Sequence, residues 1–543
     1  MSIHMNHELI SGVWDAKGLG DREGFDFAAD CLGLNFGDSV ATFADESHFF
    51  AIDGDLFDVS YDLAIRDQRR LDTAYGYFAY VRYDKQSVDI SIGTDRFGYF
   101  PIYYTFEDGR LFFGSSLAYV KSKLKHRSPD YEAWEELLVL GEVIGDKSTV
   151  KQVKRLRYGT RIDIKEGKMA VATFWTPETP EPPMDEGAYI RENNKLLGEA
   201  FALTASNPKR KVVLLSGGED SRRLAVGAVK QGLAVDFFTQ ASIYRGKYKV
   251  GVDRDVKLAA KVAEVLRRPH FSETMPDEAQ FLADWKRRDK SLGYECIAHE
   301  WLLPLARRIE PGALIYDGIV GDITLNGHYF KEFPQAVDKF RDVEALASMI
   351  CGSESHAWLD ELRRNTQSSL KQRVQELLAS YPESPHRLSY YFILNHTRRK
   401  ISCVSQLFRQ YGHSTSYPFL YYPLFMQSLR VDPKLMVDKF YQRECMAAQA
   451  PEVLSIPTTR QKDLSSDWLA LMGSKEQDQA DCLLHNLTIS SNALEMFPKL
   501  HLRYRVLQAT KGIGNTPLRK FGWFIPPVSR FSSFLDWIDS SVE

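Results

Sequence analysis

The residues best suited to carry chemistry lie in one short segment, residues 212–221, which reads VVLLSGGEDS. The apolar run 212–215 predicts a buried parallel strand. The spacing of the apolar residues after Asp220 predicts a helix that closes at Gly232. A strand, a glycine turn and a helix start bring several backbone N–H groups and the positive end of a helix dipole together. The segment therefore predicts an anion site, and phosphate is the expected anion.

Each residue type in this turn suits the binding of a polyphosphate. Gly217 and Gly218 let the backbone approach pyrophosphate closely, where a Cβ would clash. The hydroxyls of Ser216 and Ser221 can donate hydrogen bonds to phosphate oxygens. Asp220 repels an anion, so its useful role is to hold Mg²⁺, which neutralises a triphosphate.

The turn resembles the PP-loop, Ser-Gly-Gly-x-Asp-Ser, of enzymes that split ATP between its α and β phosphates and adenylate a substrate. The resemblance implies that Leu215 and the residues of the turn bind ATP, with Mg²⁺ as cofactor. It is not a Walker A loop, because no Gly-Lys-Ser/Thr follows. The competing interpretation is a Ser/Gly turn followed by an Asp-Ser helix cap. Glu219 departs from the family, and a carboxylate beside phosphates needs a neighbouring cation or an outward orientation.

Length and composition exclude several classes of protein. The chain has 543 residues, enough for about two to four domains, and a formal net charge of −3, which argues against nucleic-acid or acidic-membrane partners. No apolar stretch is long enough to cross a bilayer, and the first 20 residues lack the pattern of a signal peptide. Six cysteines are scattered without paired spacing. We therefore expect a soluble, cytoplasmic protein with reduced thiols.

A proline-rich, acidic stretch at residues 176–185 predicts a linker that divides the chain. Before it, short antiparallel strands are expected at 87–93, 102–106 and 111–113, with a tight turn at Asp108-Gly109. After it, strands at 212–215, 233–239 and 313–316 alternate with helices at 220–231, 253–267 and near 295–309. This order predicts a parallel sheet with helices on both faces, and a mostly helical chain from about residue 330 onward.

The front segment carries a second set of motifs. They are Gly76-Tyr-Phe-Ala79, Asp95-Arg-Phe-Gly98 with Pro101-Ile-Tyr-Tyr104, and Phe113-Gly-Ser-Ser116. Together they resemble the glutamine amidotransferase domain of asparagine synthetases. The resemblance implies an α/β protein in two main parts. Residues 1–178 would form a degenerate, Ntn-hydrolase-like (class II glutamine amidotransferase-like) αββα domain. Residues 186–465 would form a PP-loop ATP-pyrophosphatase domain (adenine nucleotide α-hydrolase-like) with a parallel sheet and a helical C-terminal part. Residues 466–543 are an unassigned extension.

One departure from that family concerns its nucleophile. The family's glutaminase uses an N-terminal cysteine, whose thiol attacks the amide of glutamine. This chain begins Met1-Ser-Ile-His-Met5, its first cysteine is Cys31, and it lacks the Arg-Gly-Pro-Asp and Asn-Gly-Glu stretches that bind glutamine. We expect no glutamine hydrolysis, as in the β-lactam synthetases and lasso-peptide cyclases that this chain also resembles. Cys31 is expected to be a packing residue.

Residues 316–329, which read YDGIVGDITLNGHY, resemble the synthetase stretch Ser-Gly-Glu-Gly-x-Asp-Glu-x-Phe-Gly-Gly-Tyr. They follow an expected strand, so Asp317 and Gly318 should lie at a carboxyl edge of the sheet beside the nucleotide. The resemblance makes Asp322 the ligand of a second Mg²⁺, opposite Asp220. Two aspartates from separate strand ends are suited to clamping pyrophosphate through metal ions. The competing interpretation of Asp322 is a helix-capping turn residue.

Two lysines complete the resemblance. Lys439 stands in a Lys-x-x-x-Arg-Glu pattern with Arg443, and Lys462 ends the pattern Arg460-Gln-Lys. The family implies that Lys439 reaches the α-phosphate and that Lys462 adds charge near the leaving pyrophosphate, where negative charge builds up. The competing interpretation is that each is a solvated surface lysine.

The substrate positions differ from the family. Where asparagine synthetases carry a glutamate and β-lactam synthetases a tyrosine for proton transfer, this chain has Ile319. Asp317 brings a carboxylate to the neighbourhood and is a candidate for a catalytic role. Glu295 and His299 lie four residues apart on an expected helix and are candidate substrate contacts, although that spacing also decorates exposed helices.

These residues predict an ATP-dependent ligase that forms AMP and pyrophosphate. It would adenylate a small-molecule or peptide carboxylate and transfer it to ammonia or an amine. The alternatives are a β-lactam-type or lasso-type cyclase, a uronic-acid amidating enzyme, or a non-catalytic, nucleotide-binding partner of a biosynthetic complex. A homodimer is consistent with the sequence. The sequence names neither the acid nor the nitrogen donor.

Overall fold

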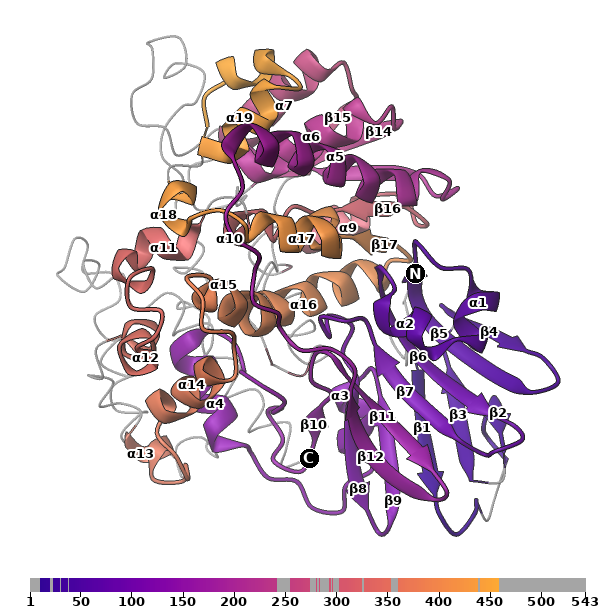
Figure 1. Ribbon diagram of the computed structural model, residues 1–543. Coiled ribbons are helices and arrows are strands. Elements are labelled where there is room, and N and C mark those ends of the chain that lie inside the picture. Colours follow the sequence, from indigo (N-terminus) through magenta and orange to yellow (C-terminus); the bar gives the residue numbers. More distant parts are fainter. Residues whose placement is uncertain are drawn as a thin grey trace.

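The computed structural model describes residues 10–458, except for the gaps 20–22, 30, 38, 242–253, 274–279, 281–282, 284–292, 294, 296–301, 325–326, 353–359 and 438–439. Within the described residues, the chain builds two antiparallel sheets first and a parallel sheet with many helices afterwards (Figure 1). Neither half contains a helix that is both long enough and apolar enough to span a membrane, as far as the described residues extend.

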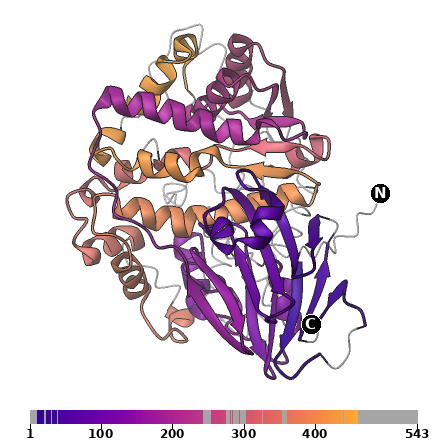
Figure 2. The same ribbon diagram turned by 45° about the vertical axis from the view of Figure 1, so that its right-hand side comes forward.

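The two antiparallel sheets each have six strands and lie face to face (Figure 2). The first has the order β10-β8-β9-β1-β3-β2, with β1 (Ile10–Asp15), β2 (Phe27–Ala28), β3 (Leu32–Phe36), β8 (Tyr103–Glu107), β9 (Arg110–Gly114) and β10 (Lys154–Arg155). The second has the order β12-β11-β7-β6-β5-β4, with β4 (Val40–Ala44), β5 (His48–Leu56), β6 (Gly76–Asp84), β7 (Ile90–Thr94), β11 (Thr160–Lys165) and β12 (Lys168–Thr173).

Strand β6 shows why the sheets stack. Successive side chains of a strand point to opposite faces. Tyr77, Ala79 and Val81 pack into the core shared by the two sheets. Phe78 and Tyr80 pack instead into a second core with α1 (Tyr61–Arg66) and α2 (Gln68–Thr73), which cover the outer face. The layered, Ntn-hydrolase-like arrangement expected for this half is confirmed.

The expected hairpin at Asp108-Gly109 is confirmed. Both residues have positive φ, 52° and 80°, and they join β8 to β9. Positive φ at both central positions defines the tight turn whose twist matches that of the flanking strands.

The second half contains a five-stranded parallel sheet of order β15-β14-β13-β16-β17. Its strands are β13 (Lys211–Leu214), β14 (Val235–Gln240), β15 (His270–Glu273), β16 (Leu314–Tyr316) and β17 (Ser414–Ser416). Helices α5 (Glu186–Ala205), α6 (Glu219–Lys230) and α7 (Arg254–Leu266) share one apolar core with the sheet, and α9 (Leu303–Arg308) and α16 (Arg398–Arg409) share another. The expected sheet with helices on both faces is confirmed. The two edge strands, β15 and β17, were not predicted.

The remaining described helices are short. They are α3 (Leu117–Ser122), α4 (Tyr131–Leu140), α10 (Gly321–Thr324), α11 (His328–Glu332), η2 (Pro334–Ala336), α12 (Val343–Cys351), α13 (Asp360–Arg363), α14 (Leu370–Ala379), α15 (Arg387–Tyr391), the π-helical η4 (Phe392–Thr397), η5 (Pro418–Leu420), α17 (Tyr422–Ser428), α18 (Pro433–Met436), α19 (Phe440–Ala447) and η6 (Pro451–Ser455). The mainly helical character expected after residue 330 is confirmed.

The stretch 176–185 has no regular secondary structure but is held against the C-terminal helices. The Tyr422 hydroxyl donates to Glu178 Oε1 (2.6 Å), and the Met184 amide donates to the Arg430 carbonyl (3.0 Å). Asp185 then caps α5 by accepting from the Ala188 amide (3.1 Å). The linker therefore crosses the protein as a docked strap.

Three buried arginines hold the two halves together. Arg398 donates from Nε to the Gly98 carbonyl (3.0 Å) and from Nη1 to the Gly145 carbonyl (3.1 Å), and it also binds the Leu156 carbonyl. Its neighbour Arg399 donates to the Lys147 carbonyl (2.8 Å). From the other half, the third arginine, at position 155, donates to the Ser402 hydroxyl (2.5 Å).

The Asp95-Arg-Phe-Gly98 motif shapes the surface that receives these arginines. Asp95 accepts hydrogen bonds from the amides of Tyr99 (3.1 Å) and Phe100 (2.8 Å), which fixes the turn. Gly98 has a φ of 66°, and a Cβ there would lie 3.0 Å from Arg398 Nε. Only glycine tolerates both the conformation and the close approach.

We expect Arg398→Met to lower the free energy of unfolding by about 3 kcal/mol, because it leaves buried carbonyls without donors. The midpoint of thermal unfolding measures the effect. Arg341→Met is the matched control: Arg341 pairs with Glu383 at 2.8 Å, but both side chains are more than half exposed, so the change should stay within about 0.5 kcal/mol. Equal losses in the two variants would contradict this role of Arg398.

Candidate functional site

The turn between β13 and α6 has the predicted strand–turn–helix form. The Leu215 amide continues the sheet by donating to the Phe238 carbonyl (2.9 Å). The two serine hydroxyls meet across the turn, with 2.9 Å between Ser216 Oγ and Ser221 Oγ. The Ser216 amide donates to Ser221 Oγ (3.0 Å), and the Gly218 amide donates to Ser216 Oγ (3.1 Å). The turn is therefore closed by its own hydroxyls, which can rotate toward a ligand.

One amide of the turn already binds an anion. The Gly217 amide donates to Asp255 Oδ1 at 2.7 Å, and Asp255 lies in the first turn of α7. A carboxylate oxygen in this place shows that the turn accepts negative charge, as its glycines and helix start predict. A phosphate that used the same amide would have to displace Asp255.

Glu219, a carboxylate beside the predicted phosphate site, forms an ion pair with Arg443. Its Oε1 lies 3.1 Å from Arg443 Nε, and its side chain is buried. Arg222, on the same helix, donates from Nη2 to the Gly217 carbonyl (3.1 Å) and from Nη1 to the Ile456 carbonyl (2.6 Å). The helix start is thus fixed to the C-terminal helices, and Glu219 adds no unpaired charge to the turn.

Asp220 packs directly against the second predicted motif. A Cβ on Gly321 would lie 2.9 Å from Asp220 Cβ and 3.0 Å from its Cγ, so only glycine fits between them. A Cβ on Gly318 would lie in ordinary contact, 3.4 Å from the Asp220 backbone. On its other side, Asp220 Oδ1 accepts from Gln442 Nε2 (2.8 Å). The two motifs, about 100 residues apart in sequence, form one site at the carboxyl edge of the sheet.

Asp322 lies in the first turn of the short helix α10 and faces the same site. Its Oδ1 is buried and has no hydrogen-bond partner. Burial, and next the Asp220 carboxylate, raise the pKa of Asp322 to about 7, while Lys400 acts in the opposite direction. Two close carboxylates with an unsatisfied oxygen suit a divalent cation. Three or more grouped metal-binding side chains are absent from the described residues, so phosphate and water would supply the other ligands.

The structure adds residues near Asp322 that the sequence did not single out. Lys400 of α16 is close enough to influence its pKa. Tyr329 also lies nearby: burial and then Asp322 raise the Tyr329 pKa well above its ordinary value. The Tyr329 ring meets His396 edge-on at 5.9 Å, and His396 Nδ1 lies 2.7 Å from Glu142 Oε2. The only sequence signal was the basic run at 396–400, and Glu142 comes from the other half of the chain.

Asp317 lies at the expected carboxyl edge but faces β17. Its Oδ1 accepts from the Ile319 amide (3.0 Å), and its own amide donates to the Ser416 carbonyl (3.1 Å). Burial raises the pKa of Asp317 to about 6, and its charge in turn raises the pKa of Tyr417. These contacts favour a turn-forming role over the catalytic role predicted for Asp317.

Glu295 lies in a buried ion network, away from any exposed helix face. It accepts from the Tyr103 hydroxyl (2.7 Å) and from Arg399 Nη1 (2.5 Å), and Arg155 Nη1 is 3.6 Å away. Only 2 % of the residue is exposed. These partners give Glu295 a structural role at the junction of the two halves.

Four predicted or supporting residues lie outside the described residues. They are His299, Lys439, Arg460 and Lys462. Their predicted roles stay predictions.

We expect Asp322→Asn to stabilise the metal-free protein at pH 8 by roughly 1–2 kcal/mol. A folded-state pKa of about 7, above the ordinary 3.8, means that the folded protein holds this proton more tightly. The wild type therefore loses stability as the pH rises from about 4 to about 7, and the asparagine variant escapes that loss. Thermal unfolding from pH 5 to 8 in EDTA tests this, and parallel curves for the two proteins would contradict it.

Comparison with known proteins identifies one part of the chain. Residues 62–175 match the family model described as the glutamine amidotransferase domain. This range runs from α1 to just beyond β12, within the two stacked sheets. No curated protein matches this sequence significantly.

Two solved structures show weak similarity. One is described as the allosteric regulatory enzyme of purine biosynthesis: it is 10% identical, with 50% of this chain and 74% of that chain covered and a TM-score of 0.20. The other is glutamine phosphoribosylpyrophosphate amidotransferase from B. subtilis complexed with ADP and GMP, at 9% identity, 50% and 75% coverage and a TM-score of 0.21.

Proposed function

We propose that the chain is an ATP-dependent amide ligase, starting from the match of residues 62–175 to the glutamine amidotransferase domain family, which agrees with the predicted resemblance to asparagine synthetases. The enzyme would adenylate a carboxylate, release pyrophosphate, and transfer the acyl group to ammonia or an amine. It would do so without hydrolysing glutamine itself. The parallel-sheet half would be the PP-loop domain that carries this reaction.

The observation that supports this proposal best is the contact between Asp220 and the segment that carries Asp322. Two strand ends are packed so tightly that Gly321 can carry no side chain, and an aspartate projects from each. The unpaired Oδ1 of Asp322 fits a metal-bound nucleotide. When bound, Mg²⁺ would neutralise the triphosphate and favour the departure of pyrophosphate.

The proposed reaction has two balanced steps. First, a substrate carboxylate oxygen attacks the α-phosphorus, and the bond between the α-phosphorus and the bridging oxygen breaks to release pyrophosphate. Second, the nitrogen of ammonia or an amine attacks the acyl carbon, AMP leaves, and the nitrogen loses a proton. Ser216, Ser221 and the turn amides would orient the phosphates, and Lys439 and Lys462 would stabilise the negative charge.

Ile319 cannot take the proton that the second step releases, so another group or solvent must do so. His396, which meets the Tyr329 ring near Asp322 and pairs with Glu142, has the chemistry of a general base. Cys31 offers no nucleophile for glutamine: it lies between β2 and β3, and its side chain packs against the apolar core.

A non-catalytic, nucleotide-binding partner is the rival from a different class. The contact between Asp255 and the Gly217 amide favours it, because a carboxylate already occupies one phosphate donor of the turn. Within the ligase proposal, a cyclase of the β-lactam or lasso type and a uronic-acid amidating enzyme use the same chemistry and differ only in the acid and amine.

ATP–pyrophosphate exchange across a panel of carboxylic acids tests the proposal. We expect exchange with at least one acid, and a loss of at least about 100-fold in Asp220→Ala and in Asp322→Ala, since each would remove a carboxylate that would hold the Mg²⁺ needed to neutralise the phosphates. Glu310→Gln is the control: Glu310 is 84% exposed, pairs loosely with Arg210 at 3.6 Å, and should leave exchange unchanged.

Two outcomes would contradict the proposal. ATP binding without exchange for any acid would favour the non-catalytic partner. Exchange that survives in both aspartate variants would place the chemistry elsewhere in the chain.

A further inference from the structure

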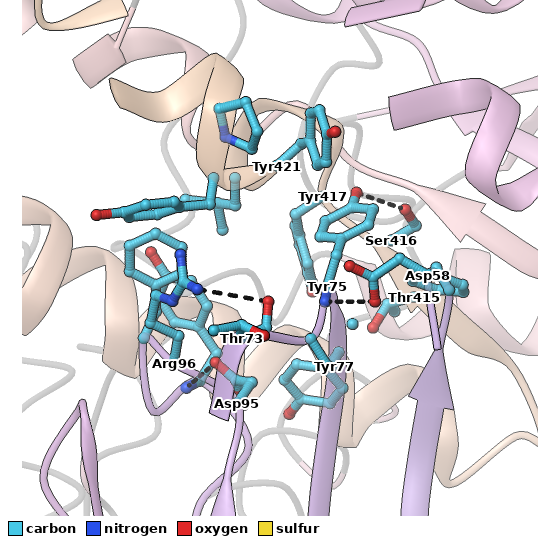
Figure 3. Close-up of a pocket in the computed structure, with 18 residues that line it drawn as sticks. Asp58, Thr73, Tyr75, Tyr77, Asp95, Arg96, Thr415, Ser416, Tyr417 and Tyr421 are labelled. Atoms are coloured by element: carbon cyan, nitrogen blue, oxygen red, sulfur yellow. Dashed lines mark hydrogen bonds between the residues drawn. The ribbon is translucent and has the colours of Figure 1, made fainter. Parts of the chain in front are cut away.

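A cavity of about 250 Å³ lies between the two halves, away from the Asp220–Asp322 site. Its walls are the start of β6, the turn after β7 that carries Arg96, and the segment 415–423, which begins in β17 and continues beyond it (Figure 3). Eight of its 18 lining residues are aromatic. The volume is below the 300–1,000 Å³ usual for drug-sized ligands, so the cavity suits a small metabolite.

Arg96 supplies a cation to this cavity that lacks a matching partner. Its guanidinium lies over the Tyr422 ring, with Cζ 3.8 Å from the centroid, and its Nη2 makes one long hydrogen bond to the Thr73 carbonyl (3.4 Å). Its Nε and Nη1 atoms are buried and donate to no acceptor. Three of the five guanidinium N–H bonds are therefore unused, which is costly for a buried charge.

The carboxylates nearest to Arg96 are already engaged. Asp58, Asp72 and Glu178 each act on the Arg96 pKa, which burial nonetheless lowers. Asp58 accepts from the Tyr75 amide (2.8 Å), and Glu178 accepts from the Tyr422 hydroxyl (2.6 Å). Asp72 pairs with another arginine at 2.7 Å. In the part of the chain that the structure describes, no carboxylate forms an ion pair with Arg96.

One tyrosine hydroxyl in the cavity wall shares this property. Tyr99 is only 3% exposed, and its hydroxyl has no hydrogen-bond partner. This hydroxyl and the Nε and Nη1 atoms of Arg96 can all donate hydrogen bonds. A ligand that satisfies donors alone must bring acceptors and negative charge.

We propose that this cavity between the two halves binds a small organic carboxylate whose body is apolar or aromatic. The carboxylate pairs with the Arg96 guanidinium, and the surrounding rings enclose the rest of the molecule. Charge-assisted hydrogen bonds of this kind are about twice as strong as neutral ones. The site goes beyond the proposed ligase chemistry and does not depend on it, since neither ATP nor Asp220 takes part.

Calorimetric titration of the full chain, without ATP or metal, tests the proposal. The probes are acetate, isovalerate, phenylacetate and inorganic phosphate, with phenylacetamide as the neutral counterpart of phenylacetate. We expect phenylacetate or isovalerate to bind with a dissociation constant of about 1 mM or lower, and phenylacetamide at least about 10-fold more weakly.

Matched variants identify the site. Arg96→Gln should weaken binding of the carboxylate at least about 10-fold. Arg157→Gln is the control, because Arg157 also lies over a tyrosine ring, at 4.8 Å from Tyr158, but outside the cavity. If Arg96→Gln fails to fold, Tyr99→Phe removes one unpaired hydroxyl without changing the packing. It should leave thermal stability unchanged or higher and weaken binding several-fold.

Three results would overturn the proposal. These are equal binding of phenylacetate and phenylacetamide, phosphate binding as tightly as any organic acid, or no binding by any of the three organic acids up to 10-fold above the expected constant, about 10 mM. Asp220→Ala should bind the carboxylate as the wild type does. Failure of ATP–pyrophosphate exchange would therefore leave this site untouched, and failure here would leave the ligase proposal standing.

Discussion

The structure depends on the buried arginines of α16. Arg398 and Arg399 bind backbone carbonyls of the N-terminal half near the start of the helix, and Arg409 pairs with Asp53 near its end. Buried guanidinium groups are unfavourable unless their N–H groups are satisfied, so this helix can only be buried when both halves are folded and in contact. The same helix carries Lys400 to the edge of the candidate nucleotide site and, with β17 after it, leads into the wall of the cavity. Helix α16 therefore sets the position of the candidate nucleotide site relative to the cavity.

Much of the architecture could be predicted from the sequence, because local signals were strong. The apolar run before Ser216 and the glycines after it fixed a strand and a turn that any parallel sheet would place at its carboxyl edge. The edge strands β15 and β17 escaped prediction. β15 has four residues, none fully buried, and β17 is Ser-Thr-Ser, which has no apolar signal at all. Both exist because neighbouring strands supply partners, which is tertiary information.

The candidate site also has a part that local sequence motifs predict and a part that only the fold reveals. Asp220 and Asp322 could be predicted because each stands in a short motif, whereas their contact depends on Gly321, whose importance only the packing reveals. The burial of Glu295 and its ion pair with Arg399 could not be predicted, because helical spacing cannot tell an exposed face from a buried ion network. Glu142, His396 and the residues of the cavity come from distant parts of the chain and carry no common motif. Single polar residues that come together from distant parts of the chain produce no periodic pattern in the sequence.

The docked strap at 176–185 limits where the gene can be cut or recombined without loss of a folded product. Glu178 is bound by Tyr422, Met184 reaches Arg430, and Tyr422 also supports the guanidinium of Arg96 from the opposite half. The strap and the C-terminal helices therefore hold each other and the N-terminal half in place through shared contacts. A gene fragment ending at the strap would encode the two stacked sheets without the C-terminal helices whose buried arginines bind them. Recombination that exchanges one half for a homologous one must preserve both faces of this junction, so the two halves should evolve as a single heritable unit.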